Sequence, residues 1–308
     1  MFVFSVLVSL GFSQILALPG EDAYQRAVAA FQQGHFEEVL SSLASLPAQE
    51  AERPAPYNLK ALTLMELRRY DEALLASEHA QRLDPDNVNY IYNAVIVYLA
   101  KHDFPGAENT LRLGIQRFPQ SSRLYEGWGE ALFAVRRFKE AELKFRKAAE
   151  LDPNSVSAQV ALAKLFHAIG DGEHLGAPAS KAVQLDPENY LACYYHGKYL
   201  LEYRSQSAEG RDYIRKSIAL SPHFVDGLIA WGTILSDDGR WAEAAQAYEQ
   251  GLIGDPRDSR LYYRLFTAYR KLGQLDKSEW ALEQYNRFVD QSTAQTGPAS
   301  PKPASTNP

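Results

Sequence analysis

Prolines recur along this chain at a nearly constant interval, and this spacing restricts the fold more than any other feature. From Pro85 onward the chain places them at Pro119, Pro153, Pro187, Pro222 and Pro256, so the successive intervals are 34, 34, 34, 35 and 34 residues. A fixed period of this size is the signature of stacked supersecondary repeats. We therefore expect one repeated building block to account for most of the chain.

Each proline marks a point where one helix stops and the next begins. Proline cannot donate a backbone hydrogen bond, and it turns the residue before it away from helical dihedrals. Two residues after five of these prolines stand side chains that cap helices well: Asn87, Ser121, Ser155, Asn189 and Asp258. Phe224 is the exception. The pattern predicts an all-α chain of helices joined by short turns.

We expect every repeat to consist of a first helix, a tight turn and a second helix. The period divides the chain into repeats near 20–53, 54–87, 88–121, 122–155, 156–189, 190–224, 225–258 and 259–292, so that the array covers about residues 20–290. Small residues such as Gly129 and Gly232 on first helices should face alanines such as Ala141 and Ala244 on second helices, because small side chains let two helices approach closely.

Three repeats depart from the regular pattern. In the first repeat, Leu46-Pro47 interrupts the second helix. In the fifth, Gly170-Asp171-Gly172 and Pro178 predict a second helix that is short or begins late. The sixth carries one extra residue around 205–210. We expect these departures to kink the array near 170–180 and 204–210.

The composition excludes several classes of function. The chain has 308 residues, 46% of them hydrophobic and 23% charged, which is typical of a folded protein. Its net charge of −6 gives no reason to expect nucleic-acid binding. His167 and His174 flank one turn without further ligands, and Cys193 falls at a core position. We expect no metal, no cofactor and no catalytic residue.

The two ends of the chain differ from the repeats. Residues 2–19 contain no charged side chain and read as a secretory signal peptide, with cleavage after Ala17. The alternatives are an uncleaved membrane anchor, a buried first helix or a misplaced start codon. If the signal peptide is cleaved, the protein is expected to be secreted or periplasmic. We expect membrane association only if residues 2–19 are retained. Residues 291–308 lack large apolar side chains, so we expect a disordered tail.

The fourth repeat resembles the tetratricopeptide repeat (TPR) family. The resemblance lies in Tyr125, Trp128-Gly129, Leu132, Phe138, Ala141, Phe145, Ala148 and Pro153, and the seventh repeat matches equally well. It extends over about eight repeats and implies a right-handed superhelical solenoid of antiparallel helix pairs. It also implies a concave groove, lined by the first helices, that binds a segment of a partner protein.

Placing the family's framework on this chain gives candidate groove residues, which are Leu62, Met65, Tyr92, Asn93, Ile96, Leu99, Phe133, Tyr194, Lys198, Tyr263, Arg260, Arg264 and Lys271. The same positions include Leu201, Ile229 and Thr233. From Leu62 to Phe133 the candidate residues are apolar. This surface suits the binding of a partner helix or an extended peptide, or alternatively these side chains pack between the protein's own helices. Arg260, Arg264 and Lys271 in the last repeat suit the binding of a carboxylate of the partner, or alternatively they form a solvent-exposed helix face.

These features predict a non-catalytic interaction scaffold or adaptor whose partner is a protein or peptide. The alternatives are a membrane-anchored envelope assembly factor, a non-catalytic subunit of a secreted enzyme complex, and an enzyme with its active residues spread over the groove. The last repeat has no helix after it to cover Trp280 and Phe288. We therefore also expect self-association through the C-terminal repeat.

Overall fold

Residues 21–205 and 207–296 of the chain are described in a computed structural model. All regular elements within these two ranges are α-helices, and none is a strand, which confirms the all-α prediction. The predicted signal peptide or anchor at 2–19 and residues 297–308 of the predicted tail lie outside the described residues.

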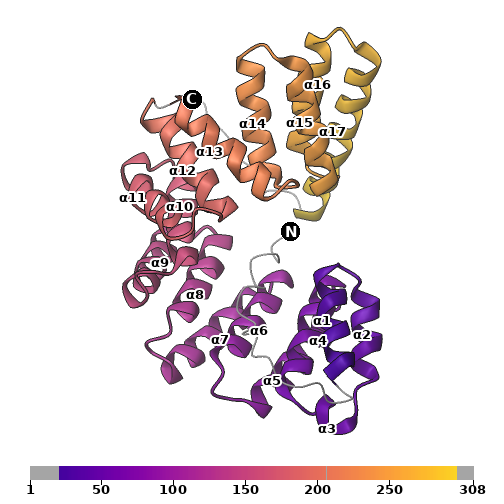
Figure 1. The fold of residues 1–308 in the computed structure, drawn as a ribbon, viewed down its shortest axis with the longest axis vertical. Coiled ribbons are helices and arrows are strands. Elements are labelled where there is room, and N and C mark those ends of the chain that lie inside the picture. The colour runs from indigo at the N-terminus through magenta and orange to yellow at the C-terminus, as the bar shows by residue number, and fades with distance from the viewer. Residues whose placement is uncertain (1–20, 206, 297–308) are drawn as a thin grey trace, which may run out of the picture. The chain divides into compact units, whose positions relative to one another are not determined.

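The described residues divide into two compact units, one before and one after the bond between Asp152 and Pro153. The N-terminal half contains α1 (Glu21–Gln32), α2 (Phe36–Ala44), α3 (Ala48–Ala51), α4 (Pro54–Glu66), α5 (Tyr70–Leu83), α6 (Val88–Ala100), α7 (Phe104–Arg117), α8 (Ser122–Ala134) and α9 (Phe138–Leu151). The C-terminal half contains α10 (Val156–Ile169), α11 (Gly172–Leu185), α12 (Tyr190–Tyr203), α13 (Ser207–Leu220), α14 (Val225–Asp237), α15 (Trp241–Gly254), α16 (Ser259–Lys271) and α17 (Leu275–Thr296). Within each half, consecutive helices pack side by side as antiparallel pairs (Figure 1).

The predicted stops and caps are present. Helices end two residues before the periodic prolines, at Leu83, Arg117, Leu151, Leu185, Leu220 and Gly254. The side chains of Asn87, Ser121, Ser155, Asn189 and Asp258 each accept a hydrogen bond from a backbone N–H in the first turn of the following helix. Phe224 makes no such bond before α14. The proline period therefore sets the helix boundaries through local backbone chemistry.

The turns inside the repeats close with a residue in the left-handed region. Gly34, Gly170, Gly239 and Gly273 have φ values between +73° and +77°. Where the sequence has no glycine, Arg68, His102 and Arg136 take the same conformation, with φ values of 59°, 61° and 61°. The turn geometry is thus conserved from repeat to repeat even where the residue is unfavourable for it.

Small residues lie where the helices of a pair pack against each other. Ala141 and Ala244 are fully buried. A Cβ on Gly129 would lie 2.4 Å from the Phe145 ring, and one on Gly232 would lie 2.3 Å from the Tyr248 ring. At these two positions the first-helix glycine therefore lies against an aromatic ring of the second helix. The volume that glycine leaves is filled by the largest available side chain.

The irregular repeats are only partly as predicted. Leu46-Pro47 does interrupt the first repeat, because α2 stops at Ala44 and the short α3 follows. The prediction of a shortened helix in the fifth repeat is wrong: α11 spans 14 residues and contains Pro178 in its interior. Pro178 is buried, so packing compensates for the hydrogen bond that it cannot donate.

The end of the array also differs from the prediction. Helix α17 spans 22 residues and continues to Thr296, into the segment that we expected to be disordered from residue 291. No glycine or proline stands in residues 291–296, and the first is Gly297. Nothing in the local sequence therefore stops the helix before that point. In the described part of the chain, no helix combines the length and apolarity needed to cross a membrane.

Candidate partner-binding site

The first helices of the N-terminal half carry the predicted apolar part of the groove. Leu62 and Met65 on α4 are only 8% and 5% exposed, and Tyr92 and Asn93 on α6 are 9% and 4% exposed. Asn93 Nδ2 donates a hydrogen bond of 2.7 Å to Asn58 Oδ1 and so joins α6 to α4. These side chains hold neighbouring helices together, which favours the packing interpretation for them.

The remaining apolar candidates in this half are more accessible. Ile96, Leu99 and Phe133 are partly buried. The guanidinium of Arg123 lies 4.5 Å from the centre of the Tyr92 ring and covers it. Burial is the main cause that raises the pKa of the Tyr92 hydroxyl, and the carboxylates of Glu126 and Glu130 add to it, so the ring stays neutral. The accessible apolar surface on the first helices of this half is therefore smaller than the sequence predicted.

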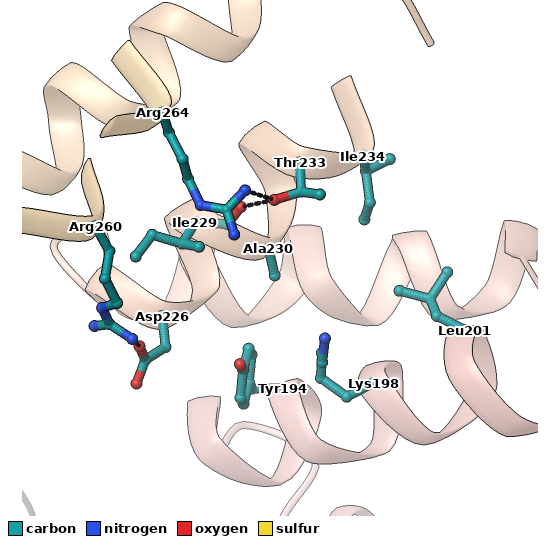
Figure 2. A pocket seen from close by; sticks show the side chains of 10 residues that line it. All are labelled: Tyr194, Lys198, Leu201, Asp226, Ile229, Ala230, Thr233, Ile234, Arg260 and Arg264. Atoms are coloured by element: carbon teal, nitrogen blue, oxygen red, sulfur yellow. Dashed lines mark hydrogen bonds and ion pairs between the residues drawn. The ribbon is translucent and has the colours of Figure 1, made fainter. Parts of the chain in front are cut away.

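The C-terminal half contains a pocket of about 220 Å³ between α12, α14 and α16. It is lined by Tyr194, Lys198, Leu201, Asp226, Ile229, Ala230, Thr233, Ile234, Arg260 and Arg264. Tyr194 and Lys198 rise from α12 toward α14, while the two arginines reach down from α16 (Figure 2). The structure thus brings four of the predicted groove residues to one hollow, together with the three further positions Leu201, Ile229 and Thr233.

The charges in this pocket are unequally neutralised. Arg260 pairs with Asp226 at 2.8 Å and with Asp258 at 2.6 Å. The hydrogen bonds that Arg260 donates to Asp258 are the main cause that raises the pKa of Arg260 further above its ordinary value. Lys198 pairs with Glu202, one turn further along α12. Neither cation is therefore available for a ligand without giving up its carboxylate.

Arg264 is the exception. Its Nη1 donates a hydrogen bond of 2.9 Å to Thr233 Oγ1, and its guanidinium lies 6.0 Å from the centre of the Tyr248 ring. Among the described residues, no carboxylate lies within ion-pair distance of it. Thr233 in turn donates to the backbone oxygen of Ile229 at 2.7 Å, which leaves its oxygen oriented to accept from the arginine. The pocket therefore holds one positioned cation without a counter-charge.

The other predicted basic and aromatic residues of α16 do not join the pocket. The ammonium of Lys271 lies 5.7 Å from the centre of the Trp241 ring. Tyr263 is 53% exposed, and its ring lies 5.5 Å from that of Tyr285 on α17. The three basic residues expected to form a stripe thus differ in their surroundings: Arg260 pairs with two carboxylates, whereas Lys271 and Arg264 each lie near an aromatic ring, and only Arg264 lines the pocket without a carboxylate partner among the described residues.

Tyr194, the one aromatic residue that lines the pocket, packs against other aromatic rings behind it. The Tyr194 ring lies 5.1 Å from Phe224 and 6.2 Å from His167. Burial, and then the nearby Lys198, lower the pKa of the His167 imidazole. Sequence reasoning missed Phe224, although its failure to follow the capping rule was the signal. Aromatic packing against Tyr194 is what this position gains in place of a cap.

The described residues contain no group of three or more metal-ligating side chains. The pocket combines apolar walls with one uncompensated guanidinium, and this arrangement is suited to binding an anion attached to an apolar group.

Family models support the repeat interpretation. Three models, each described as tetratricopeptide repeat, match residues 55–87, 92–173 and 235–295. The chain is 24% identical over 201 residues to RNA polymerase II-associated protein 3 of Mus musculus, which is 65% of this chain and 27% of that protein. This chain therefore spans about a quarter of that relative.

Solved structures show the same fold. Yeast Tom70 superposes with a TM-score of 0.62 at 16% identity, over 91% of this chain and 62% of that chain. A tetratricopeptide repeat protein from Parabacteroides merdae gives a TM-score of 0.57 at 16% identity, over 80% of this chain and 98% of that chain. At this level of identity the likeness concerns the arrangement of helices alone.

Proposed function

This chain belongs to the tetratricopeptide repeat family, and from that premise we propose that it is a non-catalytic scaffold that binds a segment of a partner protein in the pocket between α12, α14 and α16. Proteins of this family bind proteins or peptides, and their stacked repeats create extended binding surfaces. The single observation that supports this site is Arg264, a cation positioned by Thr233 and left without a carboxylate.

The pocket favours a particular kind of segment. A carboxylate of the partner forms a charge-assisted pair with Arg264, which costs little ordering entropy because Thr233 already holds the guanidinium. An apolar side chain beside that carboxylate contacts Leu201 and Ile229. Arg260 and Lys198 contribute little, since each already has a counter-charge. The partner segment therefore carries one acidic residue next to an apolar one.

Short synthetic peptides test this proposal. The wild-type protein should bind peptides with a central Glu-Leu pair about tenfold more tightly than matched Gln-Leu peptides, because only the former pair with Arg264. Arg264→Gln should remove this preference without changing helicity by circular dichroism. Arg257→Gln, an exposed arginine in the turn before α16, is the matched control and should bind like the wild type. Equal binding of both peptide sets to the wild type would contradict the proposal.

We also propose that the protein is exported, on the basis of the uncharged segment at residues 2–19. Mass spectrometry of the mature protein tests this, since a chain that begins directly after Ala17 is expected. A retained N-terminus with the protein in the membrane fraction would instead favour the membrane-anchored assembly factor. Co-purification of an enzyme through the same pocket would favour the non-catalytic subunit of a secreted enzyme complex.

A further inference from the structure

Two of the three cations in the pocket between α12, α14 and α16 are held by carboxylates. Lys198 pairs with Glu202, and Arg260 pairs with Asp226. His167 of α10, which is not part of the lining, faces the first of these pairs, with its Nε2 3.8 Å from Glu202 Oε2. Asp226 also acts electrostatically on this imidazole. One titratable group therefore lies within reach of both carboxylates that neutralise pocket cations.

The imidazole packs against the wall of the pocket. Its ring centre lies 6.2 Å from that of Tyr194, which lines the pocket beside Lys198, and 5.8 Å from that of Tyr195 (Figure 2). The side chains of His167, Lys198 and Glu202 are 28%, 21% and 37% exposed. Water and salt screen a partly buried charge less than a charge on an open surface. A proton on His167 therefore changes the electrostatics inside the pocket.

The charge of His167 depends on groups from several helices. Burial is the main cause that lowers the pKa of the imidazole. The charged groups that act on it from α12 and α14 are Lys198, which lowers the pKa further, and Glu202 and Asp226, which raise it. On α10 itself, Lys164 lies about one turn earlier, and His174 of α11 stacks on Phe166 instead. His167 is therefore neutral at pH 7 and takes up a proton only in more acidic solution.

We propose that His167 is an acid-sensing switch, which makes this pocket bind acidic segments more tightly at low pH. The inference rests on the proposed function, because it concerns the same pocket. When the imidazole takes up a proton from solvent, it competes with Lys198 for the carboxylate of Glu202. The ammonium group of Lys198 then becomes available to a carboxylate of the partner, beside Arg264. The new positive charge also offsets that of Asp226.

The direction of the pH dependence follows from this exchange. A bound carboxylate stabilises the protonated imidazole, so peptide binding and proton uptake favour each other. The affinity is lowest while His167 is neutral, and it rises as the pH falls through the pKa of His167. The carboxyl group of a glutamate in the peptide, with a pKa of about 4.3, keeps most of its charge down to about pH 5.

Isothermal titration of the full chain with the Glu-Leu peptides tests the switch. We expect binding about threefold tighter at about pH 5 than at about pH 7.5, and no gain for the matched Gln-Leu peptides. His167→Gln should bind the Glu-Leu peptides equally at both pH values. His174→Gln is the matched control, because it removes an exposed histidine from α11, and it should keep the whole gain.

The outcomes separate the switch from the proposed function. Glu-Leu binding that does not change with pH would overturn the switch and leave the proposed function intact. A gain that persists in His167→Gln would do the same, because it would come from the charge of the whole protein. Failure of the Glu-Leu peptides to bind at either pH would overturn both.

Nuclear magnetic resonance of the histidine rings gives a second measurement, in which the His167 signal is assigned by its loss in His167→Gln. Saturation with the Glu-Leu peptide should raise the pKa of His167. Without peptide, Lys198→Gln should also raise this pKa and Glu202→Gln should lower it, because these two groups act on the imidazole in opposite directions. A pKa of His167 that stays unchanged on saturation with peptide would overturn the switch.

Discussion

At the residue scale, the left-handed turn positions give a direct test of how strongly repeat geometry constrains each residue. Arg136 has a φ of 61°, where Gly239 has 76° in the corresponding turn of the seventh repeat. A residue with a Cβ is strained in this region, and glycine is not. Arg136→Gly should therefore raise the free energy of unfolding by about 0.5–1 kcal/mol, after the greater flexibility of glycine in the unfolded chain is subtracted.

Urea unfolding followed by circular dichroism measures this effect. The reciprocal variant Gly239→Arg should lower the unfolding free energy by about 1 kcal/mol, since it introduces the strain that the first variant removes. A loss of stability in Arg136→Gly would show that the arginine side chain contributes more than its backbone conformation costs.

At the element scale, the contact between the two helices of a pair depends on a missing side chain. The Tyr248 ring of α15 occupies the space over Gly232 of α14, where a Cβ would lie 2.3 Å from a ring carbon. Gly232→Ala should lower the unfolding free energy by about 1–3 kcal/mol, because the ring or the helix has to move. Gln246→Ala, on the exposed face of α15, is the control and should change it by less than about 0.5 kcal/mol. Equal stability of the two variants would contradict the close contact.

The helices also show which predictions a single sequence can support. Caps such as Asn189 were predictable because the capping bond joins residues three apart. The predicted shortening of the second helix in the fifth repeat was wrong because the free-energy cost of Pro178 inside a helix is offset by the burial of its side chain. Only the tertiary structure shows this burial. The neutralisation of Arg260 by Asp226 links two repeats, so the charges alone could not show which cation remains available.

At the scale of the whole molecule, the last described helix, α17, has no described helix after it to cover the face that earlier second helices bury. Ala245 and Leu252 of α15 pack against α16 and its neighbours in the C-terminal core. The equivalent positions of α17, 34 residues later, are Glu279 and Asn286, which are exposed. Leu275 and Leu282, however, are 63% and 36% exposed on the same face. The last helix therefore presents an apolar strip that polar side chains interrupt.

A strip of this kind supports weak and reversible pairing of two copies, since apolar contact drives association and the interrupting polar groups must lose water. We expect the mass measured by light scattering to rise with protein concentration. Leu282→Glu should give a monomer at every concentration, because it places a charge in the centre of the strip. Gln246→Glu adds the same charge to the exposed face of α15 and should associate like the wild type. A wild-type mass that stays monomeric throughout would show that Glu279 and Asn286 are sufficient to prevent pairing through α17.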